Sequence, residues 1–221
     1  MILGLDTATP ATAVGVLAQG VAGGERSHVP APGERPGHAA QLLALARAEL
    51  TAAGAGFGDV RRIAVGVGPG TFTGLRIGIA TARALAQASG AELAAVSSLR
   101  ALAAAADHDG PVLAVLDARR GEAFVGAWHG DEALLGPAAV RPEALAALAA
   151  PGAYPWLAVG DGAIKFRDAL SDAAEVPDDA DSRHRVSGLA VCRLGAAAAP
   201  IDRSALVPDY VRAPDAVPRP R

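Results

Sequence analysis

The sequence predicts a duplicated α/β fold with two subdomains. An apolar strand pattern that ends in Asp6 opens the chain, and a second apolar strand pattern ends in Asp117. Each is followed by a turn, a return strand and later a helical pattern, which indicates one βββα-type unit used twice. We therefore expect an N-terminal subdomain over 1–106 and a C-terminal subdomain over 107–202. Residues 203–221 are expected either to return to the first subdomain or to be disordered.

In the first half, short apolar runs alternate with longer helical patterns. Strands are expected at 2–5, 13–17, 63–67 and 93–96, with a weaker one from Val21, and helices at 38–53, 75–89 and 98–106. Gly54 and Gly90 follow the first two helices, as glycine commonly does at a helix end.

The helix at 38–53 carries two apolar stripes side by side. One stripe contains Leu43, Ala46 and Leu50, and the other contains Leu42 and Leu45. Because one stripe is enough to cover a sheet, the second is a candidate contact surface for another protein.

The second half repeats the pattern of the first. Strands are expected at 112–116, 123–128, 134–140 and 156–159, and helices at 142–149 and 186–198. The acidic segment 177–185 is interpreted as a solvated loop, and 213–221, with three prolines, as a disordered tail.

Composition limits the function classes. The chain is 51% hydrophobic and 19% charged, which is typical of a globular protein, and its formal net charge of -3 excludes strong RNA affinity by this chain alone. Cys192 is the only cysteine, so an intrachain disulfide and a multi-cysteine zinc site are excluded. We expect a cytoplasmic protein, because the sequence shows no signal-peptide pattern and no apolar stretch of membrane-spanning length.

A glycine-rich loop between a strand and a helix is the most informative motif. It contains the candidate anion-binding or nucleotide-binding residues Gly68, Gly70, Thr71, Thr73 and Gly74. Glycines at this position free backbone amides to face an anion, and the helix N-terminus adds positive partial charge. The alternative interpretation is a tight turn with Thr71 or Thr73 as the N-cap and close helix packing.

Asp6 and Asp117 are the second candidate site. Each ends a leading strand, where an actin-type ATPase would face its nucleotide-bound metal. The alternative, which we favour for each residue, is an aspartate that accepts hydrogen bonds from turn amides.

No catalytic residue and no metal site is predicted. The five histidines include no pair at i, i+4, the spacing that places two imidazoles on one helix face. Ser97 and Ser98 have no visible base, and no G-x-S-x-G motif occurs.

Several stretches of the sequence resemble the TsaB (YeaZ) family. They are ILGLDTAT at 2–9, GPGTFTGLRIG at 68–78, VSSL at 96–99 and LDARRGE at 116–122. LVPDYVR at 206–212 is similar to the closing P-x-Y-x-R element of the family. The resemblance runs from residue 1 to about 212, and the glycine loop is specific for this group.

The resemblance implies an actin-like fold (ASKHA, ribonuclease H-like), with a duplicated βββαβα unit in two subdomains. It also implies a role in forming threonylcarbamoyladenosine (t6A) at adenosine 37 of tRNA. In this family the chain is a non-catalytic partner that binds and activates the TsaD-type catalytic subunit, with a TsaE-type ATPase as a third component. tRNA is then reached only through the complex, and the docking surface can also form a homodimer. No cofactor is implied for the chain itself, and ATP is expected only at the complex interface.

The resemblance also places the docking surface on the first two helices. The partner-binding residues that it implies are His38, Leu42, Leu45, Glu49, Leu75, Ile79 and Arg83. We accordingly expect Leu42→Glu or Leu45→Glu to leave the fold intact and to abolish complex formation. TsaD-type chains carry H-x-x-x-H on the first helix, whereas here His38 is followed by Leu42, so the metal pair is lost.

Two other functions remain open on the sequence. An actin-fold ATPase or a metallo-glycoprotease acting on its own is favoured by Asp6, Asp117 and the glycine loop. A homodimeric tRNA-binding module is disfavoured by the acidic net charge and by an aromatic content of 4%, which leaves few surfaces for base stacking.

Overall fold

The computed structural model describes residues 1–18, 21–31, 33–149 and 155–211. Its strands are β1 (Ile2–Asp6), β2 (Thr12–Ala18), β3 (Val21–His28), β4 (Arg62–Gly68), β5 (Glu92–Ser97), β6 (Val112–Arg119), β7 (Glu122–His129), β8 (Glu132–Val140) and β9 (Leu157–Val159). Its helices are α1 (His38–Ala52), α2 (Phe72–Ser89), α3 (Ser98–Ala104), α4 (Leu145–Leu148), α5 (Asp161–Lys165) and α6 (Gly188–Ala197). Short 3-10 turns are η1 (Phe57–Asp59), η2 (Pro142–Ala144), η3 (Arg167–Ala169) and η4 (Ser182–His184).

The two halves of the chain use the same strand arrangement. The first sheet has the order β3-β2-β1-β4-β5 and the second has the order β8-β7-β6-β9. In each sheet the leading strand, β1 or β6, is antiparallel to the next strand in sequence and parallel to a later one. The duplicated α/β fold predicted from the sequence is thereby confirmed.

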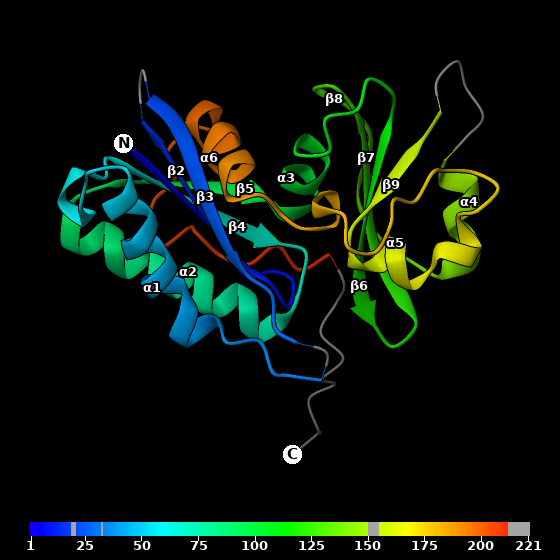
Figure 1. Cartoon of the computed structure of the whole chain (residues 1–221), viewed down its shortest axis with the longest axis horizontal. Helices are drawn as coiled ribbons and strands as arrows, with labels where there is room; N and C mark the ends of the chain where they lie inside the picture. Colours follow the sequence, from blue (N-terminus) through cyan, green and yellow to red (C-terminus); the bar gives the residue numbers. More distant parts are fainter. Residues whose placement is uncertain (19–20, 32, 150–154, 212–221) are drawn as a thin grey trace.

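Figure 1 shows α1 and α2 on one face of the first sheet and α6 on the other. Three apolar cores hold these layers and the second sheet together. The outer core of the first sheet packs Leu3, Leu5 and Ile63 against α1 and α2. A central core joins the two sheets through α3 and α6, and a third core covers the far face of the second sheet with α4 and α5. Alternate residues of each strand thus face different layers, as the two-residue period of a strand requires.

Helix α6 links the end of the chain to the first sheet. It packs on β1, β2 and β4, so its contacts cross the division that the sequence predicts at 107–202. The approach is close, because a Cβ on Gly188 would overlap the backbone of Val14. Cys192 lies in this helix and is fully buried, and burial raises the pKa of its thiol to about 12.

The chain then runs along the first sheet as a C-terminal strap (201–211). The amide of Ile201 donates to the carbonyl oxygen of Leu93 at 2.9 Å, and that of Asp209 donates to the carbonyl oxygen of Val67 at 2.8 Å. Between them, Leu206 is fully buried and Arg83 of α2 donates to its carbonyl oxygen at 2.6 Å. The tail predicted at 213–221 lies outside the described residues.

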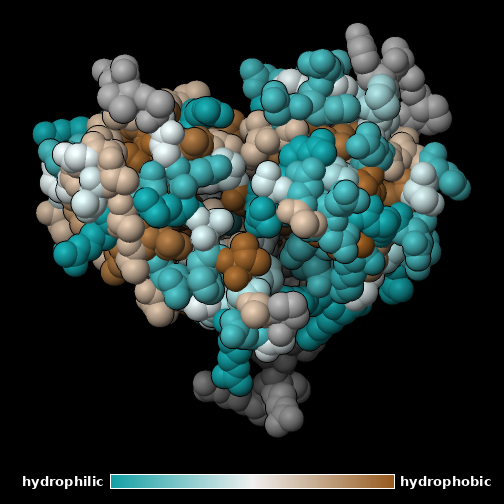
Figure 2. Space-filling view, in the orientation of Figure 1, coloured by the Kyte–Doolittle hydropathy of each residue, from teal (hydrophilic) through white to brown (hydrophobic). Residues whose placement is uncertain are grey.

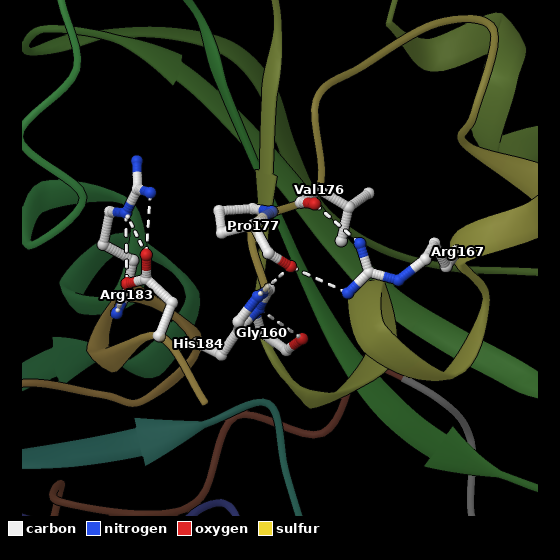
Figure 3. A network of polar contacts seen from close by, with 7 residues as sticks. Gly160, Arg167, Val176, Pro177, Arg183 and His184 are labelled. Carbon is white, nitrogen blue, oxygen red and sulfur yellow. Dashed lines mark hydrogen bonds and ion pairs between the residues drawn. The ribbon is translucent and has the colours of Figure 1, made fainter. Parts of the chain in front are cut away.

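The segment expected to be a solvated loop, 177–185, is held to the second sheet by a polar network (Figure 3). Arg167 donates to the carbonyl oxygens of Val176 and Pro177, at 2.6 and 2.7 Å. The amide of Gly160 donates to Nδ1 of the buried His184, whose Nε2 lies 3.2 Å from the carbonyl oxygen of Pro177. The solvated-loop interpretation was therefore wrong for the two ends of this segment, where Pro177 and His184 are buried. The Arg167 guanidinium and the His184 imidazole satisfy the carbonyl group of Pro177.

No helix within the described ranges is long and apolar enough to cross a membrane.

Candidate functional site

The glycine-rich loop between β4 and α2 packs directly on the β1–β2 turn. The amide of Thr71 donates to the carbonyl oxygen of Ala8 at 2.7 Å, and the hydroxyl of Thr7 donates to the carbonyl oxygen of Gly74 at 2.7 Å. A Cβ on Gly70 would overlap Ala8, and one on Gly74 would overlap the Thr7 carbonyl. These glycines are therefore accounted for by backbone packing, the second of the two interpretations, and need no bound anion.

Helix α2 begins directly after Thr71, whose amide is bound to Ala8. Thr71 occupies the N-cap position with extended backbone angles, but its side chain makes no capping hydrogen bond. Gly68, the first residue of the loop, has a φ of 113°, in the region that favours glycine. Thr73 lies in the first turn of α2 and is exposed.

Asp6 is fully buried and its carboxylate is already engaged. Oδ1 accepts from the amide of Ala8 at 2.9 Å, and Oδ2 accepts from the hydroxyl of Ser98 at 2.6 Å. A Cβ on Gly66 would overlap Oδ2, so glycine is required beside the carboxylate. Burial raises the pKa of Asp6, and the two hydrogen bonds oppose that rise.

We expect Asp6→Asn to raise the thermal stability at neutral pH. A group whose pKa is raised on folding stabilises the folded state fully at a pH below its unfolded pKa. That stabilisation is lost as the pH rises through its folded pKa. The ionised carboxylate therefore costs stability near pH 7, a cost that the neutral amide removes while keeping the Ala8 bond. Thermal melts from pH 4 to 7 measure this, and the advantage of the variant should shrink toward acid pH. A melting temperature of Asp6→Asn below that of the unaltered chain at pH 7 would show that the ionised Asp6 carboxylate does not destabilise the fold.

Asp117 also has partners within the chain. Its Oδ1 accepts from Nζ of Lys165 at 2.8 Å, and its Oδ2 lies 3.4 Å from Nη1 of Arg119. Its own amide donates to Asp161, whose pKa is raised by burial. Lys165, the only lysine of the chain, thus forms an ion pair with the Asp117 carboxylate.

The remaining histidines and carboxylates are the other possible ligands of a metal ion. Among the described residues, no group of three or more His, Cys, Asp or Glu could hold a metal ion. His38 shares a 2.8 Å hydrogen bond with the Thr12 hydroxyl, and burial, followed by the charge of His28, lowers its pKa. His108 and His129 contact backbone carbonyl oxygens.

Most of the predicted partner-binding residues face the protein interior. His38, Leu42, Glu49, Leu75 and Ile79 are all at most 7% exposed. The surface role assigned to them is therefore corrected, and so is the expectation that Leu42→Glu leaves the fold intact. Of the other two, Leu45 is half-buried and packs beside the outer core, and Arg83 is tied to the C-terminal strap.

The reason for the correction is the way α1 lies across β2 and β3. Leu42, Ala46 and Leu50 form the row that faces the sheet, whereas Leu43 is 47% exposed. Glu49 is drawn inward because its carboxylate lies 2.7 Å from Nε of Arg26 on β3. Each predicted stripe was thus wrong in one residue: Leu42 joins Ala46 and Leu50 on the side that faces the sheet, and Leu43 lies on the exposed side.

The outer face of α1 and α2 is built mainly from small residues. Its exposed residues include Ala40, Leu43, Ala44, Arg47 and Ala48 on α1, and Thr73, Arg76, Ala80, Ala84 and Ala88 on α2. Figure 2 shows apolar residues among hydrophilic ones on the half of the molecule that contains α1 and α2, while the other lobe, which contains the second sheet, is mostly hydrophilic. Alanines at i, i+4 on two neighbouring helices allow further helices to approach closely.

The chain is similar to known proteins in both sequence and structure. The family model TsaD, tRNA N6-adenosine threonylcarbamoyltransferase, matches residues 29–201. The tRNA threonylcarbamoyladenosine biosynthesis protein TsaB of Escherichia coli (strain K12) is 33% identical over 172 residues, which cover 73% of this chain and 71% of that protein.

Two solved structures from Pseudomonas aeruginosa share the fold. An uncharacterized protein with similarity to peptidase YEAZ has a TM-score of 0.80 at 30% identity, covering 96% of this chain and 99% of that one. The structure named YeaZ has a TM-score of 0.77 at 29% identity, covering 95% and 98%.

Proposed function

The chain belongs to the TsaB (YeaZ) family, and from this premise we propose that it acts in tRNA threonylcarbamoyladenosine biosynthesis as a non-catalytic partner subunit. Involvement in this biosynthesis follows from the family. The proposal adds that the chain binds and activates a TsaD-type catalytic subunit, works with a TsaE-type ATPase, and reaches tRNA only through that complex.

The outer face of α1 and α2 is the observation that carries the proposal. The inner faces of both helices pack on the first sheet, where Leu42 and Leu75 are each 1% exposed. The outer faces present Leu43 and two alanine rows with no sheet or helix of the described chain over them. A pair of partner helices laid on this face would complete a four-helix bundle and bury those side chains.

The state of the two aspartates supports a non-catalytic role. Asp6 is surrounded by Ser98, Ala8 and Gly66, and Asp117 is paired with Lys165. A nucleotide-bound metal at either carboxylate would compete with these partners. In this proposal, ATP binds with the partner subunits, and the rival enzyme hypothesis requires ATP binding by the isolated chain.

Leu43→Glu tests the docking face. The side chain is 47% exposed, so the variant should fold normally, but a carboxylate buried in an apolar helix interface should weaken binding of the TsaD-type subunit roughly 100-fold or more. Calorimetric titration with the TsaD-type subunit of the same organism measures the affinity.

The matched control is Leu134→Glu, an equally exposed leucine on β8 at 45%. It should bind like the unaltered chain. Equal affinities for both variants would reject α1 and α2 as the docking face.

A further inference from the structure

We infer that the docking face includes a preformed receptor for a carboxylate of the partner protein, built from Phe72, Arg76 and Tyr210. This inference rests on the proposed function, and it adds to the docking face the C-terminal strap and the chemistry of the group that the partner must supply.

The three side chains form an exposed, ordered cluster at the start of α2. Cζ of Arg76 lies 3.7 Å from the centroid of the Phe72 ring, so the guanidinium stacks on the ring. The ring of Tyr210 stacks beside Phe72, with centroids 6.0 Å apart and an interplanar angle of 27°. The Tyr210 hydroxyl oxygen lies 3.5 Å from Nε of Arg76. Phe72 and Tyr210 are nevertheless 56% and 46% exposed.

This arrangement suits recognition of a carboxylate. A guanidinium that stacks on an aromatic ring keeps its outer N–H groups free in a fixed plane, and that plane matches the two oxygens of a carboxylate. The stacking also restricts the rotamers of Arg76 before binding, which lowers the entropy lost on association. Arg76 forms no ion pair with any described residue of its own chain.

The charge pattern of the two helices points to the same kind of partner. The exposed charges of α1 and α2 are the cations Arg47 and Arg76, and α2 contains no acidic residue. The single acidic residue of α1, Glu49, is buried against Arg26. The strap adds Asp202 and Asp209, neither of which pairs with Arg76. A partner helix that carries carboxylates fits this surface better than a cationic one.

The same pattern disfavours a second copy of this chain as the occupant. In a two-fold dimer through α1 and α2, the same patch meets itself. The two helices of the other copy would offer Arg47 and Arg76 no exposed carboxylate, so only Asp202 and Asp209 of the strap could pair with them. The occupant that we infer is therefore a different protein with an acidic side chain at this position.

Reversal of the Arg76 charge tests the inference. Arg76→Glu should weaken binding of the purified TsaD-type subunit roughly 30-fold or more, since truncating one side of a buried charge pair has effects of this size. Arg76→Lys should recover only part of the affinity, because an ammonium group cannot present the planar fork. Phe72→Ala, which removes the stacking surface, should also weaken binding. Calorimetric titrations at low and high salt should show a weaker salt dependence for Arg76→Ala than for the unaltered chain.

Arg141→Glu, an exposed arginine of the other lobe, makes the same charge change away from the face and should bind normally. Unaltered affinity of Arg76→Glu alongside lost affinity of Leu43→Glu would reject the carboxylate receptor and leave the docking face standing. Unaltered affinity of both would reject α1 and α2 as the docking face, whereas absence of TsaD-type binding by the unaltered chain would reject the proposed function itself. Binding of tRNA to the isolated chain that disappears in Arg76→Glu, with partner affinity unchanged, would show that the cluster serves a nucleic acid instead.

Discussion

Leu42→Glu is expected to lower the free energy of unfolding by about 4 kcal/mol or more, a large part of the about 5–15 kcal/mol that is typical of a folded domain. Leu42 is 1% exposed and packs in the outer core of the first sheet beneath α1. The substitution removes a buried leucine from that core and introduces a carboxylate with no hydrogen-bond donor prepared for it. Both changes destabilise the folded state.

Urea unfolding followed by circular dichroism measures the effect, and the neighbouring Leu43→Glu supplies the control. Because Leu43 is 47% exposed, its substitution should change the free energy of unfolding by only about 0.5 kcal/mol. Similar midpoints for the two variants would show that α1 does not lie on the sheet as described here.

Gly74→Ala should produce the second large loss, about 2–4 kcal/mol, in the range of overpacked and strained core substitutions. The new Cβ would overlap the carbonyl oxygen of Thr7 and press on the Thr71 hydroxyl. A backbone carbonyl has no alternative rotamer, so α2 would have to move away from the β1–β2 turn. The loss is expected even though alanine favours a helix over glycine by about 1 kcal/mol.

Gly56→Ala is the control for this prediction. A Cβ at Gly56 meets nothing within 4 Å, and its φ of -132° is open to any residue. This variant should unfold like the unaltered chain. If Gly74→Ala does so too, while an added nucleotide stabilises the unaltered chain but not the variant, the loop serves a ligand and not the packing of α2.

The sequence predicted the elements of the fold more reliably than the faces they bury. Its strand and helix patterns are local, and the two apolar runs before Asp6 and Asp117 marked the duplication, although β6 continues past Asp117 to Arg119. The buried side of α1, in contrast, depends on the position of β3 beneath it. Periodicity allows either of the adjacent rows, with Leu42 or with Leu43, to face the sheet. In the structure the row with Leu42 faces the sheet, where Glu49 also pairs with Arg26 of β3, and neither contact has a local signal.

The candidate site was also predictable only in part, because its motifs are local and its contacts are not. The glycine loop and both aspartates stand out in the sequence, but their partners come from distant segments. Ser98 is 92 residues from Asp6, and Lys165 is 48 residues from Asp117. One signal was available for Ser98: it follows β5, which is parallel to β4 and β1, and the carboxyl ends of parallel strands meet at one edge of a sheet.

We propose that this chain acts through the outer face of α1 and α2 and not through chemistry of its own. The most direct test is tRNA threonylcarbamoylation in a system reconstituted with the TsaD-type and TsaE-type subunits. We expect the double variant Asp6→Asn, Asp117→Asn to support modification at the rate of the unaltered chain, and Leu43→Glu to support none. Loss of modification by the double variant when it is folded and bound to its partner, with full activity of Leu43→Glu, would contradict it.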